Sequence, residues 1–126
     1  MSCVLDASAL LAMLNSEPGG EAVADLLATA VISSVNWSEV VQKALARQAD
    51  VDGLRQDLEA LGLAIRPFTA EDAERTAHLR VKTQHLGLSL GDRACLALAA
   101  ALGLPAISAD RIWDDLDIGV EVRIAR

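Results

Sequence analysis

The stretch Cys3-Val4-Leu5-Asp6 places three apolar residues directly before a carboxylate. A short apolar run of this kind is typical of a strand that is buried on both faces of a sheet. An acid that follows such a strand lies at its carboxyl end, which is where open α/β sheets bind ligands. Asp6 is therefore the first candidate functional residue, and the residues around it indicate an α/β fold.

Three further acids stand at similar junctions. Glu39 follows the apolar run 31–35, Asp92 lies at the start of a long apolar helical pattern, and Asp110 follows the run 106–109. The carboxyl ends of parallel strands share one edge of a sheet, so the four acids are expected to meet in one pocket. Two carboxylates about 4 Å apart repel each other by roughly 4 kcal/mol at an effective dielectric constant of 20. Such a pocket favours a divalent cation.

The type of cation follows from the ligands. Carboxylate oxygens suit Mg²⁺ or Mn²⁺ rather than zinc. An ion held in this way can activate a water and stabilise charge on a phosphoryl oxygen. The four acids therefore point to metal-dependent hydrolysis of a phosphodiester.

Each acid also has a structural explanation as a helix cap, because carboxylates are favoured at helix N-termini. The expected capping arrangements are Asp6 ahead of the helix that follows it, Glu39 with Asn36, Asp92 with Ser89, and Asp110 ahead of Arg111. If capping is their only role, the chain is a non-catalytic α/β interaction or signalling module. The sequence leaves this alternative open.

Length and composition indicate the number of domains and exclude some classes of nucleic-acid-binding protein. The 126 residues fit one domain, 1–126, and the hydrophobic content of 52% indicates a folded core. The net charge of −7 argues against a protein that coats nucleic acid, and an aromatic content of 2% is too low for a base-stacking platform. A metal-dependent hydrolase with a local basic patch remains compatible with both values.

Cysteine usage and hydropathy favour a cytoplasmic location. Cys3 and Cys95 lie in apolar surroundings, and their spacing suggests neither a zinc site nor a redox pair. The N-terminal residues show no signal-peptide pattern. The longest apolar stretch, 94–107, contains Gly103 and Pro105 and is too short to span a bilayer.

Hydrophobic periodicity predicts alternating strands and helices. Strands are expected at 2–5, 31–35, 63–66, 104–109 and, at an edge, 121–124. Helices are expected at 7–15, 20–30, from 36 to about 49, 51–61, from 69 to near 87 with Ala73, Ala77 and Val81, from 89 to 102, and as a short turn at 111–116. This order implies a parallel sheet with helices on both faces.

Four segments that carry the acids resemble the signature segments of PIN-domain ribonucleases, and most closely those of VapC-like toxins from bacterial type II toxin–antitoxin pairs. The segments are VLDASA at 4–9, VNWSEVV at 35–41, LSLGDRA at 88–94 and ISADRIW at 107–113. They occur in order along essentially the whole chain. Each one alone would be a weak signal, whereas four in series are specific.

The resemblance implies a PIN-like three-layer α/β/α fold with a central parallel sheet of four to five strands. It implies a toxin that is a Mg²⁺- or Mn²⁺-dependent endoribonuclease, that forms a homodimer and that a cognate antitoxin inhibits. By position, the metal-site and catalytic acids are Asp6, Glu39, Asp92 and Asp110. Ser8 and Ser108 match small hydroxyl residues that support these acids.

Basic residues near the acids are candidates for RNA binding. They are Arg93 and Arg111, each next to an acid, and Lys43 and Arg47, one and two turns after Glu39. Ion pairs or solvent-exposed positions are the competing explanation. Asp114, Asp115 and Asp117 are either surface acids or a source of one more site acid. The apolar stripe Val51, Leu54, Leu58 and Leu61 is either an antitoxin-binding face or ordinary core packing.

Overall fold

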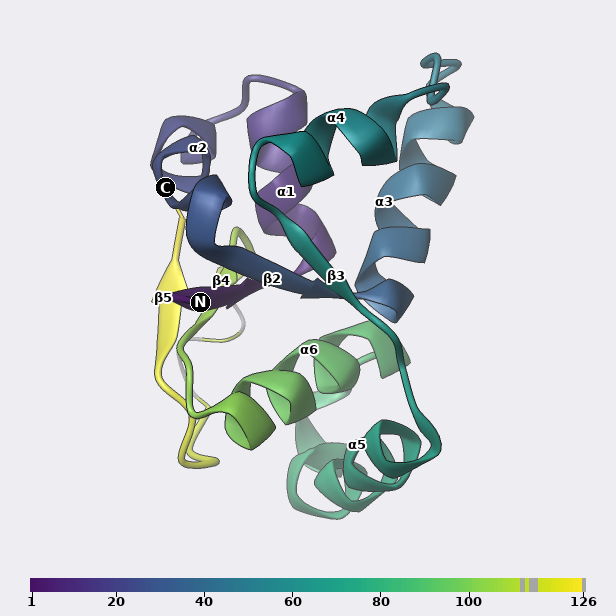
Figure 1. The fold of residues 1–126 in the computed structure, drawn as a ribbon. Coiled ribbons are helices and arrows are strands. Elements are labelled where there is room, and N and C mark those ends of the chain that lie inside the picture. The colour runs from purple at the N-terminus through teal and green to yellow at the C-terminus, as the bar shows by residue number, and fades with distance from the viewer. Residues whose placement is uncertain (112, 114–115, 126) are drawn as a thin grey trace.

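A computed structural model describes residues 1–111, 113 and 116–125 (Figure 1). The strands are β1 (Cys3–Leu5), β2 (Ala30–Ser33), β3 (Ala64–Arg66), β4 (Ala106–Ser108) and β5 (Val122–Ile124). The helices are α1 (Ala7–Leu14), α2 (Gly20–Leu26), α3 (Ser34–Ala46), α4 (Leu54–Ala60), α5 (Ala70–Thr83) and α6 (Leu90–Leu102), with 3₁₀ turns η1 (Leu27–Thr29) and η2 (Gln84–Leu86). The expected turn at 111–116 includes residues 112, 114 and 115, which lie outside the described part of the chain.

The strands form one parallel sheet in the order β3-β2-β1-β4-β5. Val4 in the central strand β1 lies opposite Val31 of β2 and Ala106 of β4. The five-stranded parallel sheet and the edge position of β5 confirm the expected fold class.

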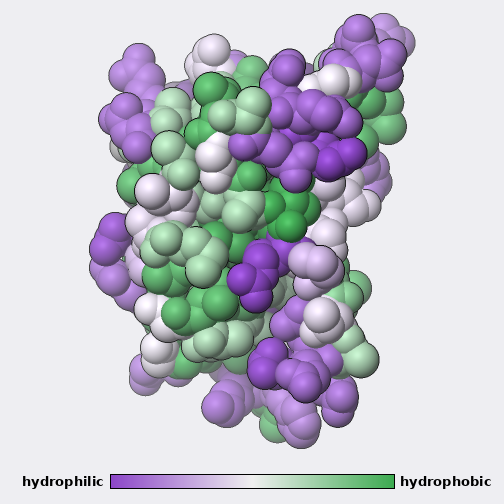
Figure 2. Space-filling view, in the orientation of Figure 1, coloured by the Kyte–Doolittle hydropathy of each residue, from purple (hydrophilic) through white to green (hydrophobic). Residues whose placement is uncertain are grey.

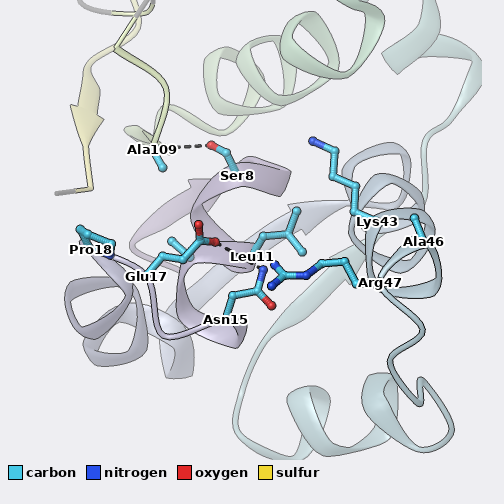
Figure 3. Close-up of a pocket in the computed structure, with 10 residues that line it drawn as sticks. Ser8, Leu11, Asn15, Glu17, Pro18, Lys43, Ala46, Arg47 and Ala109 are labelled. Carbon is cyan, nitrogen blue, oxygen red and sulfur yellow. Dashed lines mark hydrogen bonds between the residues drawn. The ribbon is translucent and has the colours of Figure 1, made fainter.

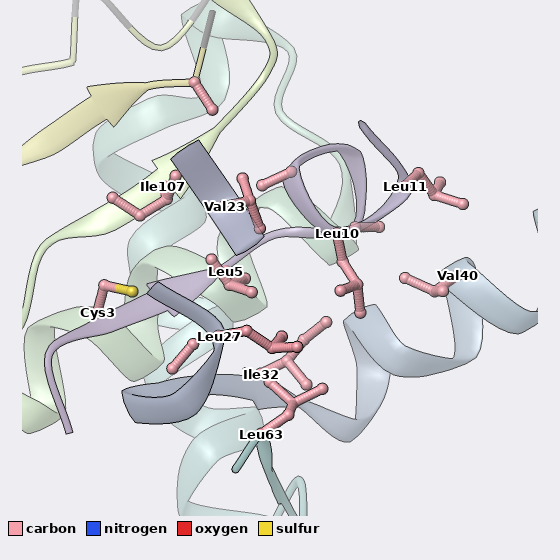
Figure 4. Packing of buried hydrophobic residues seen from close by; sticks show 14 of the residues in the cluster. Cys3, Leu5, Leu10, Leu11, Val23, Leu27, Ile32, Val40, Leu63 and Ile107 are labelled. Atoms are coloured by element: carbon pink, nitrogen blue, oxygen red, sulfur yellow. The ribbon is translucent and has the colours of Figure 1, made fainter. Parts of the chain in front are cut away.

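Alternating side chains on each strand pack against a different helical layer. Leu5 and Ile32 point into a core cluster that α1, α2, α3 and α4 cover, and Figure 4 shows its central side chains. Val4 and Val31 point the other way, into a cluster with α6. Helix α5 packs on the outer side of α6, so the fold has three layers (Figure 1). Cys3 and Cys95 are buried and free, as expected.

The connections between strands create a crevice at the carboxyl edge of the sheet. From β1 to β3 the chain crosses through α1–α4 on one face, and it then returns to β4 through α5 and α6 on the other. The connections that leave β1 and enter β4, which are adjacent strands, therefore lie on opposite faces. In doubly wound sheets such a switch in direction opens a crevice where ligands bind.

The start of α3 differs from the expectation. Ser33 is the N-cap, because its hydroxyl accepts a hydrogen bond from the backbone N–H of Val35 at 3.2 Å. The prediction that Asn36 caps this helix was wrong. Asn36 lies inside α3 and is only 1% exposed, so its side chain is available for a tertiary contact.

The face of α5 that packs against the core is not the face that carries the apolar residues noted in the sequence. Ala73, Ala77 and Val81 are exposed, whereas Thr76 and Thr83 are buried towards the core. Each threonine hydroxyl donates to the carbonyl four residues earlier, which satisfies it inside the fold. Figure 2 shows hydrophilic residues over α5 and over the far ends of α3 and α4, with hydrophobic residues between these regions.

The stripe on α4 is mainly a packing surface. Leu58 is 3% exposed and Leu54 packs against the same core cluster, so the packing explanation holds for both. Leu61 is 59% exposed. Within the described residues, no helix combines the length and the apolar character that a bilayer-spanning segment requires.

Candidate metal centre

Asp6 lies at the carboxyl end of β1 and caps α1. Its Oδ1 accepts hydrogen bonds from the N–H of Ala9 and the hydroxyl of Ser8, both at 2.8 Å. Its Oδ2 accepts a 2.6 Å hydrogen bond from the hydroxyl of Ser108, at the end of β4. The residue is only 4% exposed. Three donors therefore fix a buried carboxylate in one orientation.

Burial makes the Asp6 carboxylate costly to ionise. Loss of hydration raises its pKa from 3.8 to about 6, although the three hydrogen bonds act in the opposite direction. The negative charge of Asp92 raises the pKa further. A cation near Asp6 would offset both effects.

Ser8 and Ser108 connect Asp6 to the segment that carries Asp110. The hydroxyl of Ser8 accepts a hydrogen bond from the N–H of Ala109, and that of Ser108 accepts one from the N–H of Asp110, both at 2.9 Å. Each hydroxyl donates to Asp6 at the same time. The two serines therefore hold residues 109 and 110 beside the end of β1.

Glu39 lies one turn after Asn36 on α3. The Nδ2 of Asn36 donates to Oε1 of Glu39 and to the backbone carbonyl of Gly91, both at 2.9 Å. This amide joins the acid on α3 to the start of α6. The Oδ1 of Asn36 is buried and has no hydrogen-bond partner within the described structure.

Gly91 gives the Glu39 carboxylate its space. A Cβ on Gly91 would collide with both carboxylate oxygens of Glu39. The constraint is steric, because Gly91 lies within α6 and has ordinary helical geometry. Sequence reasoning missed this residue, since its importance depends on a neighbour 52 positions away in the chain.

Asp92 combines a capping role with a place in the pocket. Its N–H donates to the hydroxyl of Ser89 at 3.1 Å, and its Oδ2 accepts from the N–H of Ser89 at 3.0 Å. The expected capping box is therefore confirmed. The same carboxylate is close enough to Asp6 to raise the pKa of Asp6.

The four predicted acids line one small pocket at the crevice, with a volume of about 160 Å³. Its walls consist of Asp6, Ala7, Ser8, Asn36, Glu39, Lys43, Ser89, Asp92 and Asp110. Glu39 and Asp92 are half-buried, whereas Asp110 is exposed. Segments that are far apart in the sequence thus bring their carboxylates to one place.

The donor set fits a hard divalent cation. The acids supply only oxygen, which Mg²⁺ and Mn²⁺ prefer. In the part of the chain that the structure describes, however, no three acid, histidine or cysteine side chains already form a cluster that could hold an ion. Chelation by three carboxylates therefore requires side-chain rearrangement around the fixed Asp6.

The four predicted RNA-binding residues divide into two pairs. Lys43 lines the acidic pocket and an adjoining groove, and Arg47 lines that groove. Arg93 lies away from the pocket, because its guanidinium donates to the backbone carbonyl of Thr76 in α5 at 3.0 Å. Arg111 is exposed and does not line the pocket.

Asp117 and the cysteine near the site are not placed to hold an ion. Asp117 is exposed, and Asp114 and Asp115 lie outside the described residues. Burial raises the pKa of the Cys95 thiol well above its usual range, and the charge of Asp6 adds to that effect. Cys95 is therefore a neutral packing residue beneath the acids.

The sequence pattern of the PIN domain family matches residues 3–119. The chain belongs to the PIN domain family. No curated protein sequence matches it significantly.

Solved structures of toxin–antitoxin proteins share the fold. A toxin–antitoxin complex from Klebsiella pneumoniae is 22% identical, with a TM-score of 0.73 over 95% of this chain and 99% of that one. A DNA-bound VapBC from Salmonella typhimurium is 17% identical, with a TM-score of 0.75 over 100% and 99%. VapC20 from Mycobacterium tuberculosis, described as a sarcin-ricin loop cleaving toxin, is 17% identical, with a TM-score of 0.71 over 95% and 99%.

Proposed function

We propose that this PIN-domain protein is a Mg²⁺- or Mn²⁺-dependent endoribonuclease that acts as the toxin of a toxin–antitoxin pair. The observation that carries the proposal is the pocket in which Asp6, Glu39, Asp92 and Asp110 meet. Family membership and a fold like that of VapC20, a sarcin-ricin loop cleaving toxin, support the same activity.

Asp6 and Asp92 would hold the divalent ion most directly, with Glu39 and Asp110 binding through water or a second ion. When bound, the ion supplies Lewis-acid stabilisation of phosphoryl charge and lowers the pKa of a water nucleophile. The hydroxyls of Ser8 and Ser108 keep the Asp6 carboxylate oriented before an ion arrives. Preorganisation of this kind avoids a reorganisation cost during the reaction.

Helix capping alone is a weaker explanation of the acids. Asp6 and Asp92 do cap helices, so capping explains their presence. Glu39 lies inside α3, where its carboxylate pairs with the side chain of Asn36 rather than with the N-cap backbone. Helix capping therefore does not explain why the Glu39 carboxylate lies in the same pocket as those of Asp6 and Asp92.

The partners belong to the same proposal. Similarity to toxin–antitoxin complexes supports a cognate antitoxin that keeps the nuclease silent. A homodimer, an RNA substrate and action in the cytoplasm follow from the same toxin role.

Cleavage of RNA by the purified protein tests the proposal. Wild-type protein is expected to cut RNAs that contain single-stranded segments when Mg²⁺ or Mn²⁺ is present, and Asp6→Asn is expected to lower kcat/KM by about 100-fold or more, as loss of a central electrostatic group does. Asp57→Asn, at an exposed acid on α4, is the matched control and should keep full activity. Full activity of a folded Asp6→Asn protein would refute the assignment.

A further inference from the structure

A second hollow adjoins the acidic pocket. It is a groove between α1 and α3 with a volume of about 530 Å³ (Figure 3). Ser8 and Lys43 line both hollows, so the groove continues directly from the acids. The groove is further lined by Leu11, Ala12, Asn15, Glu17, Pro18, Ala46, Arg47 and Ala109.

Two cations line one side of this groove. Lys43 lies in the last turn of α3, and Arg47, four residues later, is the C-cap of that helix. The two residues therefore lie on the same side of the helix end, about 6 Å apart along the axis. Figure 3 shows the Lys43 side chain reaching towards Ser8 and the Arg47 guanidinium turned towards Asn15. Both residues are exposed, and neither has a carboxylate at ion-pair distance among the described residues.

The opposite side of the groove contains an acid, Glu17, whose repulsion of an anion is reduced by a hydrogen bond. Among the residues that the structure describes, Glu17 is the one carboxylate that lines the groove, and its Oε1 accepts a hydrogen bond from Asn15 at 3.3 Å. Leu11 and Ala12 contribute apolar surface between the two sides. The groove therefore offers two cations in a row next to a surface on which sugars and bases can rest.

We propose that this groove binds successive phosphates of a single-stranded RNA through Lys43 and Arg47, so that the strand leaves the acidic pocket along α3. This inference rests on the proposed nuclease function and gives its substrate a path. Cations one helical turn apart can meet consecutive phosphates of an extended strand. With so few aromatic residues in the chain, the backbone is the part of RNA that the protein can hold.

A single strand fits this site better than a duplex. The acids are recessed in a pocket of only about 160 Å³, so a phosphodiester must be brought into it to react. An extended strand can bend into such a recess, whereas the backbone of an A-form duplex is held rigidly on its surface.

The salt dependence of RNA binding tests the proposal. Fluorescence anisotropy of a short unstructured RNA would be measured with Ca²⁺ in place of Mg²⁺. Each phosphate contact to a single strand contributes about −0.7 to the slope of log K against log salt. Lys43→Met and Arg47→Gln should each make the slope about 0.7 less negative, and the double variant about 1.4.

Matched controls come from α5. Lys82→Met and Arg80→Gln remove the same residue types from an exposed helix surface away from the groove, and their slopes should equal that of the wild type. Equal slopes for the groove variants and these controls would overturn the proposal, and so would absence of RNA binding by the wild type. Equal slopes are the result expected if the groove binds a protein partner instead of RNA.

The form of the RNA and the cleavage assay give two further outcomes. The single strand should bind more tightly than a duplex of the same sequence, and equal or stronger binding of the duplex would overturn the assigned path. Altered slopes without any cleavage would refute the nuclease function and keep the phosphate-binding groove. RNA cleavage together with unchanged salt slopes would refute the phosphate-binding groove and keep the nuclease function.

Discussion

Glu39 keeps its carboxylate in a space that exists only because residue 91 is glycine. The amide of Asn36 holds the same carboxylate from the other side and also bonds to the carbonyl of Gly91. A single acid is therefore positioned by one missing side chain and one buried amide. Both constraints lie at the contact between α3 and α6.

Gly91→Ala should disturb the site while it improves the helix. Alanine is favoured over glycine by about 1 kcal/mol in a helix interior and by less in the first turn, where Gly91 lies, but its Cβ would displace the Glu39 carboxylate. We expect RNA cleavage to fall about 10-fold or more and the affinity for Mn²⁺ to weaken, as when a metal-site support is removed. Isothermal titration and cleavage kinetics measure these effects.

A double-mutant cycle with Glu39→Ala separates the clash from other causes. In the Glu39→Ala background, Gly91→Ala should stabilise the fold by up to about 1 kcal/mol, because only the helix propensity remains. Urea denaturation of the four proteins gives the coupling. Strictly additive changes in the free energy of unfolding would contradict the steric explanation.

The sequence indicated which acids to consider but not how they are held. Asp92 was predicted in a capping box and is found in one, because that motif is local. Asn36 and Glu39 have the same three-residue spacing, yet Ser33 caps the helix and the Asn36 amide makes a tertiary bridge. Spacing alone does not distinguish these two uses of the pair. The role of Gly91 depends on a contact that no local pattern contains.

At the scale of elements, α5 and α6 begin in the same way. Thr69 and Asp72 form a capping box on α5 that repeats the one of Ser89 and Asp92 on α6. Asp72 lies away from the acidic pocket, and the hydrogen bond from the Thr69 backbone is the main cause of its lowered pKa. Asp72 is therefore a control for Asp92, because it caps a helix in the same way but does not line the acidic pocket.

Substitution of the two capping acids should separate the roles. Asp72→Asn should destabilise the metal-free protein by about 0.5–1 kcal/mol at pH 7, and this loss should shrink as the pH falls and the Asp72 carboxylate is protonated. Asp92→Asn should cost less, because it also removes a charge that raises the pKa of Asp6. Denaturant unfolding in a chelating buffer measures both changes.

Added Mn²⁺ provides the second half of this test. Binding to the folded state alone raises stability, so the melting temperature of wild type and Asp72→Asn should rise with the Mn²⁺ concentration. The rise should be smaller for Asp92→Asn. An equal response of the two variants would assign Asp92 to capping only.

Element boundaries followed from the sequence where a local signal marks them. Gly103 ends α6 in the left-handed conformation, as its position after the apolar pattern predicted. Strand β4 is shorter than the expected 104–109, because Leu104 and Pro105 lie before the first residue that pairs. The inner face of α5 was not predictable from apolar spacing, since its buried residues include two threonines that satisfy their own hydroxyls.

At the scale of the whole molecule, alternation of strands and helices was enough to predict the parallel sheet and its two helical layers. It was not enough to predict how closely the acids would approach, because that depends on side-chain hydrogen bonds across the crevice. The buried Asp6 also affects the global stability. Its ionisation in the fold costs about 3 kcal/mol, since its pKa is raised from 3.8 to about 6.

Asp6→Asn should therefore stabilise the metal-free protein in a pH-dependent manner. The unfolded chain loses its Asp6 proton near pH 4 and the folded chain near pH 6, so wild-type stability falls as the pH rises through that interval. The variant should be more stable by up to about 3 kcal/mol at pH 8, with a smaller gain at pH 5.5. Urea denaturation with a chelator measures this, at pH values above the pI of about 4.6.

Asp57→Asn on the exposed face of α4 is the control and should change little at either pH. A lower stability of Asp6→Asn at pH 8 would mean that the three hydrogen bonds to the Asp6 carboxylate outweigh the cost of its burial. That result would favour capping as the main role of this residue.

The hydroxyl of Ser108 donates to the carboxylate of Asp6 across 102 positions of sequence, and this long-range hydrogen bond determines when the acidic pocket can assemble. During synthesis Asp6 is translated first, and its partner Ser108 at the end of β4 appears only after more than a hundred further residues. A nascent chain that does not yet include β4 therefore has no assembled pocket. Under the proposed nuclease function, a nascent chain therefore cannot cleave RNA until β4 has been translated and has paired with β1.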